Sequence, residues 1–256
     1  MSILLPIYMY HEITPTAAGR RNSHLQVSAG ALSRQIDELR GLGFALVTLS
    51  EAWGRIEEGI ATPRLAVLTF DDLDQAFYEH AWPVLQERNA PATAFYITGE
   101  PGLGSPSRMT DPGRKLARGR LLELADGGVE IGSHTVTHRE LIGLADAEAL
   151  EELVGSRSDL EEKLGRPVST LCYPRGRFSR RIMTLAEEAG YACACATLRG
   201  SLQSRAERFA LRRIRADEAR SGLRLRYTAM RLYDLWNLPR RRREQAAYER
   251  QERAWL

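Results

Sequence analysis

Apolar residues in this chain follow two alternating patterns. Short continuous runs, such as Leu65 to Leu68, are separated by segments in which apolar residues recur every three or four positions, as Leu32, Ile36 and Leu39 do. The runs are typical of strands buried on both faces, and the spaced segments are typical of helices with one packed face. Because the two patterns alternate from residue 3 to residue 215, they predict an α/β fold with a parallel sheet, open or closed into a barrel.

The predicted elements have recognisable start and stop signals. Ser28 and Ser179 are suited to cap helices, and Gly43 and Gly190 are suited to end them. We expect strands at 3–10, 45–48, 65–70, 92–97, 129–133, 170–173, 191–197 and 211–215, and helices at 29–42, 50–58, 76–85, 119–126, 146–164 and 179–189. Residues 99–113 are rich in Gly and Pro, which predicts a long loop, and we expect a lid or substrate-facing loop there.

The composition is that of an ordinary folded protein. Of the 256 residues, 43% are hydrophobic and 27% are charged, and the net charge is only +3. No apolar stretch approaches the roughly 18 residues of a membrane-spanning helix, and the N-terminal residues lack the pattern of a secretory signal. The three cysteines, Cys172, Cys193 and Cys195, lack zinc-ribbon spacing. We therefore expect reduced thiols and a cytoplasmic location.

Two adjacent carboxylates, Asp71 and Asp72, directly follow the predicted strand 65–70. Ligands of helix-covered sheets bind beyond the carboxyl ends of the strands, so this is a position where chemistry is common. The two carboxylates repel each other and call for a compensating charge such as a metal ion. The alternative is structural, with Asp72 as a helix N-cap or both residues as a solvated strand end.

A pair of histidines, His134 and His138, follows the predicted strand 129–133. If this segment forms a helical turn, the two imidazoles lie on one side of it and can reach one metal ion. Together with Asp72 they make three ligands with an open position, as in catalytic metal sites. Asp71 is then placed to take a proton from water at the metal. Taken without Asp72, the pair has a common structural alternative as two surface or core histidines.

Other polar residues share this placement. His11 and Arg175 also come directly after predicted strands. In a parallel sheet the carboxyl ends of the strands lie at one edge, so we expect these side chains to converge with those of Asp71, Asp72 and His134.

These motifs together resemble the polysaccharide deacetylases of the NodB-homology type, carbohydrate esterase family 4. The resemblance rests on Thr69-Phe70-Asp71-Asp72, on His134-Thr135-Val136-Thr137-His138, and on Cys172-Tyr173-Pro174-Arg175-Gly176, which is similar to the family's Pro-Tyr-Gly loop. The segments 6–11, 27–28 and 43–49 resemble the branch related to poly-N-acetylglucosamine deacetylases. The resemblance implies a distorted (β/α) barrel of about seven strands, with a catalytic domain at 1–216.

The resemblance also implies residue roles. Asp71 corresponds to the catalytic base, and Asp72, His134 and His138 correspond to the ligands of a divalent metal, usually Zn²⁺. The backbone N–H of Arg175 corresponds to the group that helps to hold the oxyanion. The branch places its general acid at the position of His11, although His11 is also suited to a hydrogen-bonding role at a strand end. Substrate contacts are expected at Tyr173, Pro174, Arg175 and Arg213.

The chain departs from the family pattern at two places in the site. Leu73 follows Asp72 where the family has Gly, so the turn must form without a residue that favours left-handed backbone. Arg175 replaces the loop aromatic, which removes a stacking surface and adds a positive charge. We therefore expect an altered substrate that carries a carboxylate or phosphate group.

Beyond residue 216 the resemblance ends. Residues 217–256 predict a basic amphipathic helical extension that includes Leu223, Tyr227 and Met230 and ends near the run 240–243 of four arginines. Such a helix is suited to pack on the domain, or to dock at a membrane surface or on a partner. No motif indicates nucleic acid binding.

The sequence therefore predicts a metal-dependent hydrolase that removes the N-acetyl group of an N-acetylated sugar or glycoconjugate. Without a visible signal peptide, we expect a nucleotide-linked, lipid-linked or small soluble sugar rather than a finished polymer. The alternatives are a hydrolase of the same fold that acts on another small amide or ester in metabolite biosynthesis, and a non-catalytic carbohydrate-binding protein. The presence of all the ligand residues disfavours the last of these.

Overall fold

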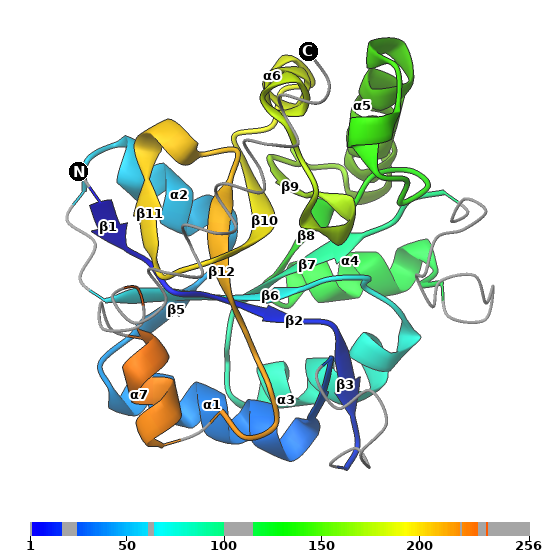
Figure 1. Cartoon of the computed structure of the whole chain (residues 1–256). Helices are drawn as coiled ribbons and strands as arrows, with labels where there is room; N and C mark the ends of the chain where they lie inside the picture. The colour runs from blue at the N-terminus through cyan, green and yellow to red at the C-terminus, as the bar shows by residue number, and fades with distance from the viewer. Residues whose placement is uncertain are drawn as a thin grey trace.

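A closed barrel of seven parallel strands forms the centre of the computed structural model, which describes residues 2–16, 25–60, 64–99, 115–220, 222–229 and 234 (Figure 1). The strands are ordered around the barrel as β2 (Ile7–Tyr10), β12 (Leu211–Arg215), β10 (Cys193–Arg199), β9 (Thr170–Cys172), β8 (Val129–Ser133), β7 (Ala92–Tyr96) and β6 (Leu65–Phe70). The pairing of β2 with β6 closes the barrel. A further strand, β5 (Ala45–Val47), pairs in parallel with the first half of β6. The predicted barrel of about seven strands is confirmed.

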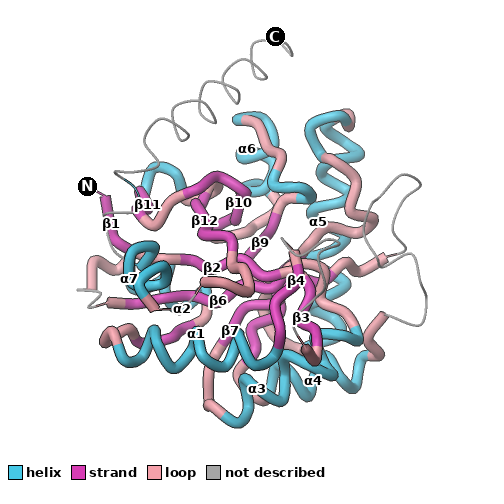
Figure 2. The backbone as a smooth tube through the Cα atoms, turned by 60° about the horizontal axis from the view of Figure 1, so that its bottom comes forward, coloured by secondary structure: helices cyan, strands magenta, loops and turns pink. Residues whose placement is uncertain are grey.

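Helices surround the barrel, as Figure 2 shows. They are α1 (Ala29–Gly41), α2 (Leu49–Glu57), α3 (Trp82–Glu87), α4 (Arg118–Asp126), α5 (Asp146–Leu164), α6 (Arg180–Glu188) and α7 (Leu223–Ala229), with a π-helical turn at Phe77–Ala81 and short 3-10 turns at Leu141–Gly143, Pro174–Gly176 and Arg205–Glu207. The predicted caps at Ser28 and Ser179 form, because each side-chain hydroxyl accepts a hydrogen bond from a backbone N–H of the first turn.

One end of the barrel is closed by α2. Its apolar side chains, such as Trp53, pack with barrel-lining residues that include Val67 and Phe95. The N–H of Ser50, in the first turn of α2, donates to the carboxylate of Glu130 at 3.1 Å, and Glu130 also accepts from the hydroxyl groups of two strand threonines. Because Glu130 lies near the start of β8, α2 covers the amino ends of the strands. The carboxyl ends remain available for a site.

Three short strands lie outside the predicted pattern. The predicted strand 3–10 is divided at Pro6 into β1 (Ser2–Leu4) and β2, because proline has no N–H to donate to a neighbouring strand. β1 leaves the barrel and pairs antiparallel with β11 (Leu202–Ser204). A separate parallel pair joins β3 (Glu12–Thr14) to β4 (Gln26–Ser28). β3, β4 and β11 have three residues each of mixed polarity, so no apolar run in the sequence predicted them.

The described part of the predicted extension packs on the domain. α7 lies against α1, and the N–H of Gly222 donates to Glu38 of that helix at 2.6 Å. The carboxylate of Glu218 accepts hydrogen bonds from the backbone N–H and the hydroxyl of Ser28. Apart from Asp234, residues 230–256, which include the arginine run, lie outside the described residues. Most of the predicted lid at 99–113 lies outside them as well.

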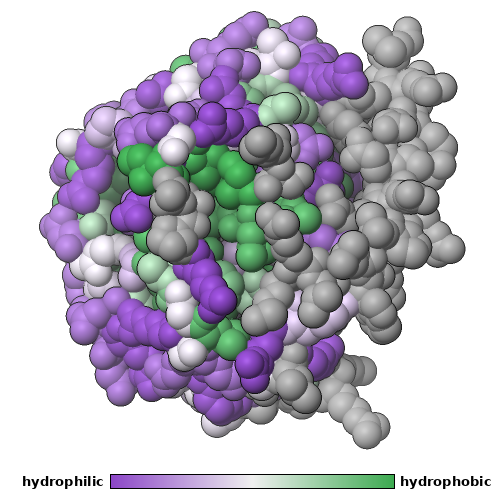
Figure 3. All heavy atoms as spheres, turned by 90° about the vertical axis from the view of Figure 1, so that its left-hand side faces the viewer, coloured by the Kyte–Doolittle hydropathy of each residue, from purple (hydrophilic) through white to green (hydrophobic). Residues whose placement is uncertain are grey.

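None of the helices in the described ranges has the length and apolar character needed to cross a bilayer. On the side of the molecule that carries β1 and α2, the described surface is largely hydrophilic around a hydrophobic patch (Figure 3).

Candidate metal centre and catalytic site

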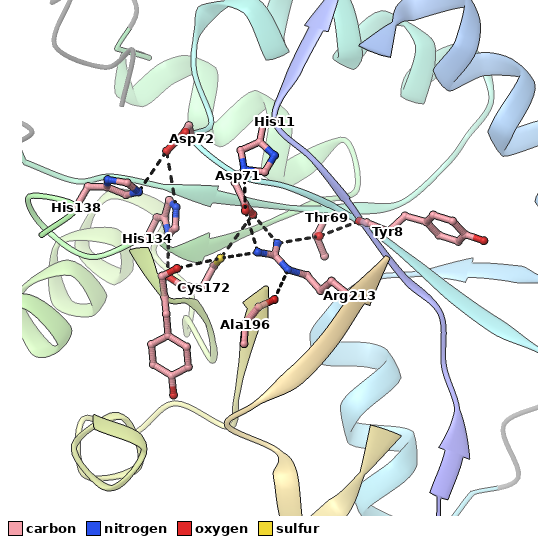
Figure 4. Close-up of polar contacts among 11 residues, drawn as sticks. Tyr8, His11, Thr69, Asp71, Asp72, His134, His138, Cys172, Ala196 and Arg213 are labelled. Atoms are coloured by element: carbon pink, nitrogen blue, oxygen red, sulfur yellow. Dashed lines mark hydrogen bonds and ion pairs between the residues drawn. The ribbon is translucent and has the colours of Figure 1, made fainter. Parts of the chain in front are cut away.

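The polar residues singled out in the sequence converge at the carboxyl ends of the barrel strands. His11 follows β2, Asp71 and Asp72 follow β6, and His134 follows β8 (Figure 4). His138 joins them from the segment after β8, and its ring centroid lies 4.7 Å from that of His134. The predicted convergence is therefore present in the structure.

Asp72, His134 and His138 form a set of ligands suited to one metal ion. The Oδ1 atom of Asp72 lies 3.7 Å from Nε2 of His134 and 3.7 Å from Nε2 of His138. Ligand atoms bound tetrahedrally to zinc at about 2.1 Å are about 3.4 Å apart, so the three atoms are close to the spacing required. Oδ1 of Asp72 is buried and has no hydrogen-bond partner among the described residues. A divalent cation fits this donor set.

The Nε2 atoms of both histidines face this position. Nδ1 of His134 lies 2.7 Å from the carbonyl oxygen of Cys172, and a hydrogen on Nδ1 donated to that carbonyl leaves the Nε2 lone pair for a metal. Burial lowers the pKa of His138 to about 3, and the positive charge of Arg175 acts in the same direction. His138 is therefore neutral at physiological pH and can act as a ligand without losing a proton.

The segment that carries His138 is not a helical turn, and that part of the prediction was wrong. Thr135 and His138 both have left-handed backbone, with φ of 67° and 58°. The hydroxyl of Thr135 accepts from the N–H of His138 at 3.1 Å. The two rings approach each other across this tight loop, with their centroids 4.7 Å apart.

Glu152 of α5, which the sequence pattern did not single out, supports this loop. Its carboxylate accepts hydrogen bonds from the N–H groups of Val136 and Thr137 and from the hydroxyl of Thr137. Only 7% of Glu152 is exposed. The available signal was a charged residue beside Leu153 on the apolar face of the helix, which a search for apolar periodicity passes over.

The turn after β6 takes its left-handed residue at Asp72 rather than at the position where the family has Gly. The φ angle of Asp72 is 55°, and Asp is among the residues that tolerate this conformation. Leu73 is fully buried, and its N–H donates to the carbonyl oxygen of Phe95 at 2.9 Å. Leu73 therefore packs in the core and leaves the carboxylate of Asp72 free to face His134 and His138.

Asp71 is held by a buried arginine. Nη1 and Nη2 of Arg213 donate to Oδ1 and Oδ2 of Asp71 at 2.6 and 2.9 Å. Burial alone would raise the pKa of Asp71, but the adjacent guanidinium and His11 outweigh it and hold that pKa well below its ordinary value. The thiol of Cys172 lies 3.6 Å from Oδ1 of Asp71 and 3.2 Å from Nη2 of Arg213. Asp71 is thus a fixed carboxylate beside the ligand set.

His11 stands on the outer side of Asp71. Its Nε2 atom lies 3.7 Å from Oδ2 of Asp71, and its side chain is 26% exposed. Desolvation lowers the pKa of His11, while the negative charges of Asp71 and Asp72 act in the opposite direction. His11 therefore lies between Asp71 and the solvent-exposed side of the site.

The residues expected to contact substrate occupy different environments. Arg213 is 1% exposed and binds Asp71, so it positions the carboxylate and does not reach a substrate. Tyr173 is fully buried and stacks on Phe178, and Pro174 is also buried. Arg175 is exposed at the rim, with φ of 55°. Of the four, Arg175 alone presents its side chain to the surroundings.

The positive charge of Arg175 is not isolated. Its Nη1 atom donates to Oε1 of Glu140 at 2.8 Å, and Nη1 of Arg177 lies 3.5 Å from the other carboxylate oxygen of the same residue. Glu140 lies two residues after His138, so this surface ion-pair group is attached directly to the metal-binding loop.

Comparison with known proteins identifies polysaccharide deacetylases as relatives of this chain. A model of the polysaccharide deacetylase family matches residues 58–194, which is more than half of the chain. YxkH of Bacillus subtilis (strain 168), a polysaccharide deacetylase by name, is 27% identical over 219 residues, covering 85% of this chain and 73% of YxkH. Poly-beta-1,6-N-acetyl-D-glucosamine N-deacetylase of Staphylococcus aureus (strain MSSA476) is 24% identical over 183 residues, covering 68% of this chain and 62% of that enzyme.

Solved structures show a matching fold. The Streptococcus pyogenes deacetylase PplD, solved in complex with acetate, has a TM-score of 0.78 and 25% identity, over 90% of this chain and 100% of PplD. IcaB from Ammonifex degensii has a TM-score of 0.71 at 23% identity, over 88% of this chain and 96% of IcaB. Each similarity extends over most of the barrel-forming chain.

Proposed function

The chain belongs to the polysaccharide deacetylase family, and from this premise we propose that it is a metal-dependent hydrolase that removes the acetyl group of an N-acetylated sugar or glycoconjugate. One observation carries the proposal. Three ligand atoms, from Asp72, His134 and His138, lie close together beside the carboxylate of Asp71 at the carboxyl ends of the barrel strands. The donor set of two imidazoles and one carboxylate favours Zn²⁺.

A metal held by these three residues supplies Lewis-acid chemistry, since it polarises a carbonyl oxygen and lowers the pKa of water. Asp71 is proposed as the base that accepts a proton from the attacking water. The Arg213 pair keeps Asp71 ionised and fixes both of its oxygens, so the base is present over the whole physiological pH range. The backbone N–H of Arg175 is proposed to help to hold the negative oxygen that develops.

His11 is proposed to deliver the proton to the departing amine. Because its Nε2 atom lies 3.7 Å from Oδ2 of Asp71, a proton taken from water by Asp71 can pass to His11 and then to the amine nitrogen. The hydroxyl group of the water joins the acetyl carbon, the carbon–nitrogen bond breaks, and the products are acetate and the free amine. The lowered pKa of His11 makes the protonated ring a strong acid for this step.

The staphylococcal relative is named for a poly-N-acetylglucosamine substrate, and the chain spans 62% of its length. We propose the same chemical class, an N-acetylated amino sugar, for this chain. Arg175 is the proposed substrate contact at the rim, and its charge is suited to a carboxylate or phosphate group on the sugar or its carrier.

An acetate-release screen tests the proposal. The purified Zn²⁺-loaded protein is incubated with N-acetylglucosamine, its oligomers, and nucleotide-linked N-acetyl sugars, and acetate is measured by an enzyme-coupled assay. We expect release from at least one of these classes, and its loss in Asp71→Asn with zinc content unchanged. Bound zinc without acetate release from any of the substrates would favour a non-catalytic carbohydrate-binding protein.

A further inference from the structure

The loop that carries His138 adopts a conformation that side chains usually disfavour. Thr135 and His138 are both left-handed and neither is Gly, so each carries a steric cost that the surroundings must offset. Without this conformation, Nε2 of His138 would not be held 3.7 Å from Oδ1 of Asp72. Something outside the loop must therefore fix it.

Glu152 of α5 holds the loop from outside through hydrogen bonds. Its Oε2 atom accepts from the N–H of Val136 at 2.9 Å and from the N–H of Thr137 at 2.8 Å, and its Oε1 atom accepts from the hydroxyl of Thr137. These donors lie between the two left-handed residues. Only 7% of Glu152 is exposed, yet within the described part of the chain no cationic side chain forms an ion pair with it. Its buried charge is therefore balanced by loop donors.

A second residue of α5 fixes the start of the same loop. Ser156, one helical turn after Glu152, lies with its hydroxyl 2.7 Å from that of Ser133, and the Ser133 hydroxyl accepts from the N–H of Thr135 at 3.1 Å. α5 thus supports the loop at its start and at its middle, through residues at i and i+4. The helix acts as a rigid support for the histidine ligands.

We propose that Glu152 is a positioning residue for metal binding, which holds His138 in the conformation that completes the ligand set. The inference rests on the proposed function, because it assigns Glu152 to the same metal site. Three donors converge on two carboxylate oxygens, whereas the amide of Gln offers one oxygen and an NH₂ group. A Gln at this position can keep its one oxygen on the two N–H groups only if its NH₂ group faces the Thr137 hydroxyl, which must then accept instead of donate, and the stronger hydrogen bonds to a carboxylate are lost.

Metal binding by the full chain tests this inference. Zn²⁺ affinity is measured by competition with a chromophoric chelator for wild type, Glu152→Gln and the control Glu151→Gln, whose side chain is exposed on the same helix. We expect about 10-fold to 100-fold weaker binding in Glu152→Gln, the range found for residues that orient metal ligands. We expect wild-type affinity in Glu151→Gln.

A spectroscopic measurement separates positioning from general destabilisation. The visible absorption of Co²⁺ in the same proteins reports ligand number and geometry, and it should change in Glu152→Gln but not in Glu151→Gln. Thr137→Val, which removes a single donor to Glu152, should weaken binding in the same direction and serves as the test if Glu152→Gln does not fold.

The possible results are distinguishable. Wild-type Zn²⁺ affinity and an unchanged Co²⁺ spectrum in folded Glu152→Gln would overturn the role of Glu152 and leave the proposed function intact. Absence of Zn²⁺ and Co²⁺ binding by the wild-type protein would instead overturn the proposed metal site itself.

Discussion

Arg213 and Asp71, separated by 142 residues in the sequence, form a two-point ion pair at the centre of the barrel. Arg213 lies on β12 and Asp71 follows β6, so the pair joins strands on either side of β2. Both side chains are almost fully buried. Arg213 is anchored in turn, because its Nε atom donates to the carbonyl oxygen of Ala196 at 2.9 Å. The pair therefore links the proposed base to the framework of the barrel.

Removing the guanidinium should harm both stability and activity. In Arg213→Ala the Asp71 carboxylate is left buried without its partner, which costs about 3–5 kcal/mol of unfolding free energy. Chemical denaturation measures this loss. Arg215→Ala, an exposed position on the same strand, should change stability by no more than about 0.5 kcal/mol.

Arg213→Lys gives the sharper test of the catalytic argument. Lysine keeps the charge but cannot make two parallel hydrogen bonds to the carboxylate. We expect a variant that folds and binds zinc but has a lower kcat, because Asp71 is no longer fixed at both oxygens. Unchanged kcat would show that the two-point geometry does not matter for the reaction.

The metal-free protein should lose stability as the pH falls. His138 is neutral in the folded protein down to about pH 3, whereas in the unfolded chain it takes up a proton near its ordinary pKa of 6.5. Between these values the unfolded state binds more protons, so unfolding free energy declines with falling pH by up to about 1.4 kcal/mol per unit for this group.

Urea denaturation of the chelator-treated protein between pH 7 and pH 4 measures this decline. His138→Gln removes the titrating imidazole. In this variant the unfolding free energy should therefore fall less steeply with pH, by up to about 1.4 kcal/mol per pH unit. Identical slopes in the two proteins would contradict the burial of a neutral His138.

The turn after β9 should depend on a glycine. Gly176 has φ of 66°, and a Cβ atom there would overlap the side chain of Thr197. Gly176→Ala should therefore destabilise the protein by about 1–3 kcal/mol and displace the neighbouring Arg175 N–H, lowering kcat. Gly41→Ala is the matched control, because a Cβ atom at Gly41 meets no other group within 4 Å. Equal stability of the two variants would count against the described loop.

Arg175 should influence the choice of substrate more than it influences stability. Its ion pair with Glu140 is partly exposed, and such pairs contribute at most about 1 kcal/mol. In Arg175→Ala we expect KM for an anionic N-acetyl sugar conjugate to rise by roughly threefold to tenfold, with little change for a neutral one. Arg139→Ala, which removes an exposed arginine paired with Glu148 instead, serves as the control. Parallel changes for both substrates would contradict a charge-recognition role for Arg175.

The sequence was most informative where the hydrophobic pattern was continuous. The predicted strands 65–70 and 129–133 match β6 and β8 at both ends. The same feature located Asp71, Asp72 and His134, since residues directly after parallel strands meet at one end of the sheet. Proximity in sequence to a strand end was thus sufficient to gather most of the site.

Other features depend on contacts that local pattern does not encode. The partner of Arg213 lies on another strand, so its sequence neighbourhood gave no sign of Asp71, and it was expected to contact substrate instead. The loop that carries His138 is hydrogen-bonded through Val136 and Thr137 to Glu152 on α5, a contact that the local pattern does not encode, and the helical prediction failed there. Leu73 was expected to complicate the turn, but the left-handed residue is Asp72.

The central claim is that hydrolysis depends on a metal held by Asp72, His134 and His138. The most direct measurement is acetate release by chelator-treated protein during titration with Zn²⁺, with the substrate that performs best in the screen. We predict no release without metal, full recovery at one equivalent of Zn²⁺, and no recovery at one equivalent in Asp72→Ala. Undiminished acetate release by the chelator-treated protein, or recovery in Asp72→Ala equal to that of wild type, would contradict it.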